Sequence, residues 1–168
     1  ARTAKELAVL LHQMGDLSPS EIAAICVVDP SGWIGRLAGE RRIVLQAIPT
    51  THGLEERWIA AEYAEDYSRA FLPTLRTLPT YSTLPTLPDH LTNLPVYPST
   101  DAARHILERY LHHAGPVTTE DIRRRYDFPI DWLQTELDRL LADRELAEGR
   151  FTPPSAPSTL HSPPSTLH

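Results

Sequence analysis

The side chains of this 168-residue sequence best suited to chemistry with a partner are its arginines. Of the 16 basic residues only Lys5 is a lysine, so 15 are arginines. A guanidinium carries a permanent charge and a planar set of donors that matches the oxygens of a phosphate. Three arginines are consecutive, and four others lie within a short stretch of the N-terminal half. We predict nucleic-acid contacts from these seven residues: Arg36, Arg41, Arg42, Arg57, Arg123, Arg124 and Arg125.

The sequence offers little to the familiar kinds of enzymatic chemistry. A P-loop needs a lysine directly after a glycine-rich turn, because the ammonium must reach the nucleotide phosphates, and Lys5 follows no such turn. The eight histidines and the single Cys26 lack the spacing of a zinc site. Glu62, Glu65 and Asp66 could form a carboxylate pair, but they fit the solvated face of a helix better. We therefore expect no catalytic residue, no metal and no cofactor in this chain.

Composition also limits the partners and the compartment. The formal net charge is −6, which does not suit a protein that holds nucleic acid by bulk electrostatics alone. Cys26, the single cysteine, lies in an apolar run; it excludes an internal disulfide and is compatible with a reducing cytoplasm, where we expect the protein. No apolar stretch of about 18 residues and no signal peptide is present, so we expect no membrane partner.

Proline and threonine divide the chain into four parts. Residues 1–71 and 99–151 have helix and strand patterns. Residues 72–98 repeat Leu-Pro, and because proline lacks a backbone donor and disfavours helix at the preceding residue, we interpret them as an extended connector that packs along a domain surface. Residues 152–168 contain the related heptapeptides SAPSTLH and SPPSTLH, and we expect them to be disordered.

The second patterned part has the layout of a winged helix-turn-helix. Its first helix begins at Ser99 or Thr100. A capping box of Thr118 and Asp121 begins a short helix, and Pro129 suits the first turn of a longer helix. The residues that follow, RELAEGRF, are expected to start a strand or small hairpin. Helix, short helix, longer helix and strand is the order of a winged helix.

The first patterned part repeats this order, and GDLSPSEIAAI parallels GPVTTEDIRRR of the second. Apolar spacing and cap residues predict three helices, a hairpin and a closing helix. The three helices are expected at 6–14, 18–25 and 31–38, the strands at 42–48 and 57–60 with a wing tip at 50–53, and the closing helix at 61–71. The predicted fold class is thus mainly α with small β wings (α+β), built as two winged-helix-like modules joined by a Pro/Thr/Leu-rich connector.

Several of these segments resemble a known family. The stretch from Arg109 to Phe151, the stretch ERWIAAEYAEDYSRAF, the segment GDLSPSEIAA and the spacing of Gly32, Trp33 and Leu37 are similar to the accessory region of Lhr-type (large helicase-related) ATP-dependent helicases of the DEAD/DEAH class. The family's histidine before Gly-Pro is shifted here, where His113 is followed by Ala114. The resemblance covers the chain from about Leu7 to Phe151 and matches the connector least.

The resemblance implies that the chain is a non-catalytic accessory region of a DNA-processing helicase. ATP and Mg²⁺ would then be bound by motor domains that precede this region, and those motor domains and nucleic acid, DNA rather than RNA, would be its partners. Two alternatives stay open. The chain could be a structural or protein-interaction domain, because the third helix of the second module carries Asp131 and Asp138, which repel phosphate. It could also be part of a winged-helix DNA-repair glycosylase.

The three tryptophans, Trp33, Trp58 and Trp132, lie among apolar residues at structural spacing. Stacking on a nucleobase and packing in a core are both available to such rings. The apolar neighbours favour core packing for all three.

Overall fold

The computed structural model describes residues 1–77, 99–147 and 149. The described chain is mainly helical and contains one three-stranded antiparallel sheet. This confirms the predicted fold class of a mainly α protein with a small β component. None of the described helices is long and apolar enough to span a bilayer.

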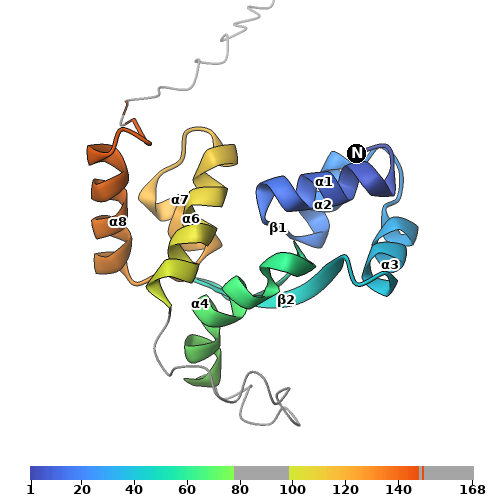
Figure 1. Ribbon diagram of the computed structural model, residues 1–168, viewed down its shortest axis with the longest axis horizontal. Coiled ribbons are helices and arrows are strands. Elements are labelled where there is room, and N and C mark those ends of the chain that lie inside the picture. Colours follow the sequence, from blue (N-terminus) through green and yellow to red (C-terminus); the bar gives the residue numbers. More distant parts are fainter. Residues whose placement is uncertain (78–98, 148, 150–168) are drawn as a thin grey trace, which may run out of the picture.

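The N-terminal elements are three helices and a hairpin (Figure 1). The sheet order is β1-β3-β2, so the hairpin of β2 and β3 is completed at one edge by the short β1. Asp16 pairs with Ile59 and Leu17 with Trp58, which ties the segment after α1 to the sheet. The elements are α1 (Ala4–Met14), β1 (Asp16–Leu17), α2 (Pro19–Ile25), α3 (Ser31–Gly39), β2 (Ile43–Thr50) and β3 (Gly53–Ala60).

The predicted capping box at α7 is present in the structure, and a second one begins α2. Ser18 accepts a hydrogen bond from the backbone of Glu21, whose carboxylate accepts one from the backbone of Ser18, and Pro19 occupies the first turn of α2. Thr118 and Asp121 do the same at α7. These reciprocal bonds satisfy donors that a helix start otherwise leaves free, so four adjacent residues suffice to fix where each helix begins.

The C-terminal helices are α6 (Thr100–Ala114), α7 (Thr119–Arg125) and α8 (Ile130–Ala142). Ser99 caps α6. Of the predicted strand or hairpin after α8, the described residues 144–147 form turns and bends without a strand. The remainder of that prediction, the disordered tail at 152–168 and most of the connector lie outside the described residues.

One predicted boundary is wrong. The prolines place the start of the connector at Leu72, but α4 (Ala64–Thr77) continues as helix past Pro73. Proline removes one backbone donor from a helix, so the carbonyl of Arg69 lacks its partner one turn later. That carbonyl accepts a hydrogen bond from the backbone N–H of Ser99 at 3.1 Å instead. Because the freed acceptor is satisfied by the start of α6, the helix does not have to end at the proline.

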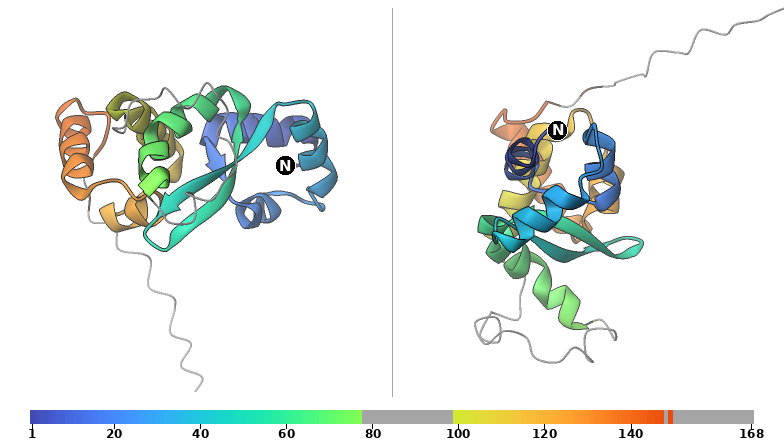
Figure 2. Two further views of the ribbon diagram at one scale, coloured as in Figure 1. Left: turned by 90° about the horizontal axis from the view of Figure 1, so that it is seen from below. Right: turned by 90° about the vertical axis from the view of Figure 1, so that its right-hand side faces the viewer.

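Two buried clusters form the core, and α4 belongs with the second. The first cluster joins α1, α2, α3 and the start of β2. The second contains Ile48 and Ile59 of the hairpin, the buried face of α4 and the inner faces of α6, α7 and α8. Figures 1 and 2 show α4 between the hairpin and the C-terminal helices. The two halves of the chain are thus joined by a continuous apolar contact.

The tryptophans pack as the apolar spacing predicts. Trp33 and Trp58 lie against the first cluster and Trp132 against the second, all partly buried. The Trp132 ring is 5.0 Å from that of Phe128, centroid to centroid. Each indole therefore serves the core rather than an exposed stacking surface.

Candidate nucleic-acid interface

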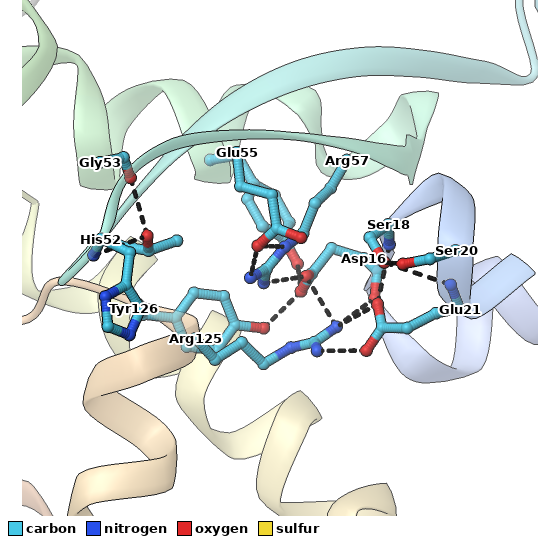
Figure 3. Close-up of polar contacts among 12 residues, drawn as sticks. Asp16, Ser18, Ser20, Glu21, His52, Gly53, Glu55, Arg57, Arg125 and Tyr126 are labelled. Atoms are coloured by element: carbon cyan, nitrogen blue, oxygen red, sulfur yellow. Dashed lines mark hydrogen bonds and ion pairs between the residues drawn. The ribbon is translucent and has the colours of Figure 1, made fainter.

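Two of the seven predicted arginines converge in the interior instead of on the surface (Figure 3). Arg57 of β3 is 3% exposed and Arg125 ends α7, yet their side chains meet at Asp16 of β1. Arg57 Nη1 donates to Asp16 Oδ2 at 2.8 Å, and Arg125 Nη2 donates to the same oxygen at 2.9 Å. The carboxylate itself is fully buried. One acid thus bridges two guanidinium groups from opposite halves of the chain.

The other oxygen of Asp16 is occupied by two tyrosines. Tyr67 of α4 donates its hydroxyl to Oδ1 at 2.8 Å, and Tyr126 donates to the same atom. Burial, with the neighbouring charge of Asp16, raises the pKa of both phenols well above the usual value of a tyrosine. Both therefore remain protonated donors, and four side-chain donors satisfy the carboxylate of Asp16. We call these five residues the Asp16 network.

Each arginine of the Asp16 network has a second acid. Arg57 Nη2 lies 2.5 Å from Glu55, and Arg125 Nη1 lies 2.6 Å from Glu21, the capping-box glutamate of α2. Although burial opposes it, the Arg125 guanidinium lowers the pKa of Glu21. The charges of Arg57 and Arg125 are thereby neutralised inside the protein, so we leave both out of the proposed nucleic-acid surface.

Close packing accompanies the network. Gly15, which precedes Asp16, has a φ of 92°, and a Cβ built on it would lie 2.9 Å from Arg109 Cδ and 3.0 Å from the hydroxyl of Tyr67. A side chain there would push against α4 and α6. Gly15 therefore meets both a conformational and a steric requirement at the joint between the two halves.

Three other predicted arginines remain exposed and lie together at the end of α3. Arg36 Nε donates to Glu40 at 2.8 Å, and Arg42 Nη1 is 4.0 Å from the same carboxylate. Arg41 has no acid within 4.0 Å among the described residues. Among these three guanidinium groups, one carboxylate pairs with two and leaves the third without an acid, and we call Arg36, Arg41 and Arg42 the α3 arginine cluster.

The remaining two arginines lie apart from this cluster. Arg124 Nε is 3.4 Å from Glu120 on the same helix. Arg123 is half-buried, and its Nε has no hydrogen-bond partner among the described residues. Figures 1 and 2 place α7 and α3 toward opposite ends of the molecule. The consecutive arginines of α7 therefore do not act as one surface, because each points into a different environment.

The outer face of α8 is acidic, as expected from the sequence. Asp131 and Asp138 are exposed on it, together with Gln134 and Thr135. Arg139 lies between helices and pairs with acids of α6 and α8 and with Asp143. Arg139, the one basic residue of α8, is therefore already neutralised and does not offset the two aspartates. The helix has the wrong charge to enter a DNA groove.

The possible carboxylate pair after β3 also has basic partners. Glu62 contacts His12 at 2.5 Å, Glu65 contacts Arg69, and Asp66 lies 4.0 Å from Arg109. Within the described residues no group of three or more His, Cys, Asp or Glu side chains is arranged to hold a metal. Glu65 and Asp66 thus lie beside arginines, and Glu62 lies beside an imidazole.

Sequence reasoning misses the centre of the Asp16 network. By its position Asp16 is part of a helix cap, and Tyr67 and Tyr126 are ordinary members of helical patterns. The sequence around Asp16 gives little indication of this role, because an aspartate between two helices is usually exposed. Its partners are 41 to 110 residues away in sequence.

Comparison with known proteins gives one informative similarity. The chain is 28% identical over 152 residues to a protein of Mycolicibacterium smegmatis (strain ATCC 700084 / mc(2)155) named "Lhr helicase/ probable uracil glycosylase". The aligned region covers 90% of this chain but 9% of that protein, so the chain corresponds to a small part of a much longer relative. No protein-family model matches the chain. The similarity agrees with the resemblance to Lhr-type helicases found in the sequence.

Proposed function

We propose that this chain is a non-catalytic accessory region of an Lhr-type ATP-dependent helicase that contacts DNA through the α3 arginine cluster. ATP and Mg²⁺ would be bound by motor domains outside this chain, and the region would act in the cytoplasm. The carrying observation is that three exposed guanidinium groups lie together while only two of them, Arg36 and Arg42, have a carboxylate, that of Glu40, within 4.0 Å. Surplus positive charge on an otherwise acidic chain favours a local contact with phosphate.

The order of the N-terminal elements supports this role. Helix, strand, two helices and a hairpin is the order of a winged helix, in which the third helix enters the major groove and the hairpin touches the backbone. Here α3 is that third helix, and the α3 arginine cluster lies at its C-terminal end. The tip of the hairpin, Thr51 and His52, is exposed as a wing requires.

The exposed face of α3 is also unusually free of side chains. Gly32, Gly35 and Gly39 each have no heavy atom within 4 Å of the place a Cβ would occupy. Internal packing therefore does not require glycine at these positions, although each glycine inside a helix lowers stability by about 0.5–1 kcal/mol relative to alanine. A bare helix face lets a nucleic-acid backbone approach closely, which supplies a reason for glycine there.

The C-terminal helices contribute as a scaffold in this proposal. They present an acidic face on α8 and hold the N-terminal elements through the Asp16 network and the shared apolar cluster. Their exposed acids fit a contact with other protein domains, such as the motor domains, better than a contact with DNA. Positioning of α3 relative to a motor would follow from this rigid attachment.

A salt-titrated binding assay tests the proposal. The chain is titrated with forked, single-stranded and duplex DNA, and with RNA of the same sequence, at several salt concentrations. The variant Arg36→Gln/Arg41→Gln/Arg42→Gln should lose most of the affinity and flatten the salt dependence by about 3 in slope, about 1 per phosphate contact.

The matched control removes the same charge elsewhere, as Arg2→Gln/Arg69→Gln/Arg144→Gln. It should retain most of the affinity, since only the general field changes. Equal losses in the two variants, or no salt-sensitive binding of the parent chain at micromolar concentration, would contradict DNA contact through the α3 arginine cluster.

The name of the relative favours a second candidate function, participation in a DNA-repair glycosylase. The same protein preparation can be incubated with a uracil-containing oligonucleotide, and strand breakage at the resulting abasic site measured after alkali. Excision above a no-protein control would replace the non-catalytic proposal. Binding without excision supports the accessory role.

A further inference from the structure

A groove of about 510 Å³ lies beside the α3 arginine cluster, between α1, the end of β3 and the turn into β2. Its apolar floor includes Ala8 and Ala60, and its rim carries Arg41 and Arg42 on one side and His12 and Gln13 on the other. Two cations, an amide and an imidazole thus surround a concave surface. Val9 and Ala61 also line the groove, so most of its surface is apolar and the groups that can donate to an anion stand at the rim.

Arg41 adopts a conformation that its side chain disfavours. Its φ is 54°, in the left-handed region, where glycine is the usual residue after a helix. The backbone N–H groups of Arg41 and Arg42 donate to the carbonyls of Ala38 and Leu37, so the helix end fixes this conformation whatever the side chain. Arginine thus stands where glycine would relieve strain, and unlike Arg144, which has the same conformation, Arg41 lines the groove.

The balance of charge in the groove is positive. Glu62 also lines the rim, but its carboxylate lies 2.5 Å from His12 Nδ1, and the hydroxyl of Tyr63 lies 3.1 Å from the same nitrogen. Arg42 is only at the limit of ion-pair distance from Glu40, and Arg41 has no acid within 4.0 Å among the described residues. Two guanidinium groups are therefore free to bind an anion while His12 holds the acid of the opposite wall.

We propose that this groove binds a phosphodiester of the nucleic-acid backbone, with Arg41 and Arg42 as the charged donors and the side-chain amide of Gln13 as a neutral donor. The inference rests on the proposed function and deepens it, because it fixes where the strand passes: over α1 and the start of β2, and not only along α3. The bound backbone would then run between the hairpin and α1.

The matched pair Arg41→Gly and Arg144→Gly tests this assignment. Arg144 follows α8 with a φ of 61°, the same left-handed conformation, but does not line the groove. Both glycine variants should unfold at a higher urea concentration than the parent, which shows that each is folded. Arg41→Gly should nevertheless bind duplex DNA about tenfold more weakly, with a salt slope reduced by about 1, while Arg144→Gly binds as the parent does.

A second variant places the contact in the groove itself. Gln13→Glu on α1 should weaken DNA binding at least as much as Arg41→Gly, since an added carboxylate faces the phosphate. Inorganic phosphate at millimolar concentration is the comparison probe. The NMR signals of the Arg41 and Gln13 side chains are followed during both titrations. A change in these signals with DNA but not with phosphate identifies the polymer backbone as the ligand. A change with phosphate alone overturns the assignment to nucleic acid.

The failures of the two proposals are distinguishable. If the parent chain binds DNA and Arg36→Gln weakens it, but Arg41→Gly and Gln13→Glu do not, the groove assignment is wrong and the proposed function stands. If the parent binds no nucleic acid, the proposed function itself is wrong. Equal weakening by Arg41→Gly and Arg144→Gly would show that general charge, and not the groove, controls binding.

Discussion

Replacement of Asp16 by asparagine should destabilise the protein and uncouple the unfolding of its two halves. The carboxylate is fully buried and accepts hydrogen bonds from Arg57, Arg125, Tyr67 and Tyr126. The Asp16→Asn variant would keep the shape but lose the charge that balances two buried guanidinium groups. Removing one partner of a buried ion pair costs about 3–5 kcal/mol.

The structure places the expected loss at the lower end of that range. Arg57 keeps Glu55 and Arg125 keeps Glu21, so neither guanidinium is left without a carboxylate. The amide oxygen of the asparagine can still accept from the hydroxyls of both tyrosines. We therefore expect Asp16→Asn to lower the free energy of unfolding by about 3 kcal/mol and Asp16→Ala, which also leaves the tyrosine donors unsatisfied, by about 5 kcal/mol.

Urea denaturation with tryptophan fluorescence measures both the loss and its location. Trp33 and Trp58 report on the first core cluster and Trp132 on the second, so single-reporter backgrounds follow each cluster alone. In the parent the two transitions should coincide. In Asp16→Asn they should separate, because the polar half of the joint is broken while the apolar contacts within each cluster remain.

The matched control is Asp138→Asn, an equal change of charge on the exposed face of α8. It should shift stability by less than about 0.5 kcal/mol, as surface substitutions do. A loss below about 1 kcal/mol for Asp16→Asn, with the two transitions still coincident, would refute the reasoning that this carboxylate couples the halves.

Two tyrosines, one glutamate and one glycine give further expected outcomes. Because Tyr67 and Tyr126 have raised pKa values, the folded state favours their neutral form. Their contribution to the free energy of unfolding is complete below the unfolded pKa near 10 and is lost at higher pH. The urea midpoint of the parent should therefore fall above about pH 10, and that of Tyr67→Phe should fall less steeply. Hydrogen bonds from Arg104 lower the pKa of Glu136, so its contribution to stability is present above about pH 4.5 and is lost as the pH falls through the folded pKa. A Glu136→Gln variant should be less stable at neutral pH, and its stability should decline less steeply with acid. The same decline with acid in the parent and the variant would contradict this. Gly35→Ala should raise stability by about 0.5–1 kcal/mol by thermal unfolding and weaken DNA binding, and unchanged binding would remove the bare face of α3 from the proposed interface.

Local features of the chain were predictable because their causes are local. Ser18 with Glu21 and Thr118 with Asp121 are close in sequence and bond to each other, so the starts of α2 and α7 follow from four adjacent residues. Alternation from Arg42 to Ile48 predicts the first strand of the hairpin within a few residues of its observed bounds. The acidic face of α8 follows from helical spacing alone.

The end of α4 was not predictable from such rules. A proline usually marks the end of a helix, because the carbonyl that it leaves without a donor has no other partner nearby in sequence. Here the partner is Ser99, beyond the connector. The expectation that a helix ends at proline failed because a residue distant in sequence bonds to the carbonyl that the proline leaves free.

The division of the arginines was decided by tertiary structure alone. In sequence Arg57 and Arg125 have the same chemistry as Arg41, and nothing near them shows which will be buried. Asp16 and Arg125 meet across 109 positions, so their pairing depends on how α7 packs against the sheet and not on neighbouring residues. The sequence by itself determined that nearly all of the chain's basic side chains are arginines. Only folding decided which guanidinium groups lie in internal ion pairs and which stay exposed, since distant segments bring Asp16 to Arg57 and Arg125 but bring no buried acid to Arg41.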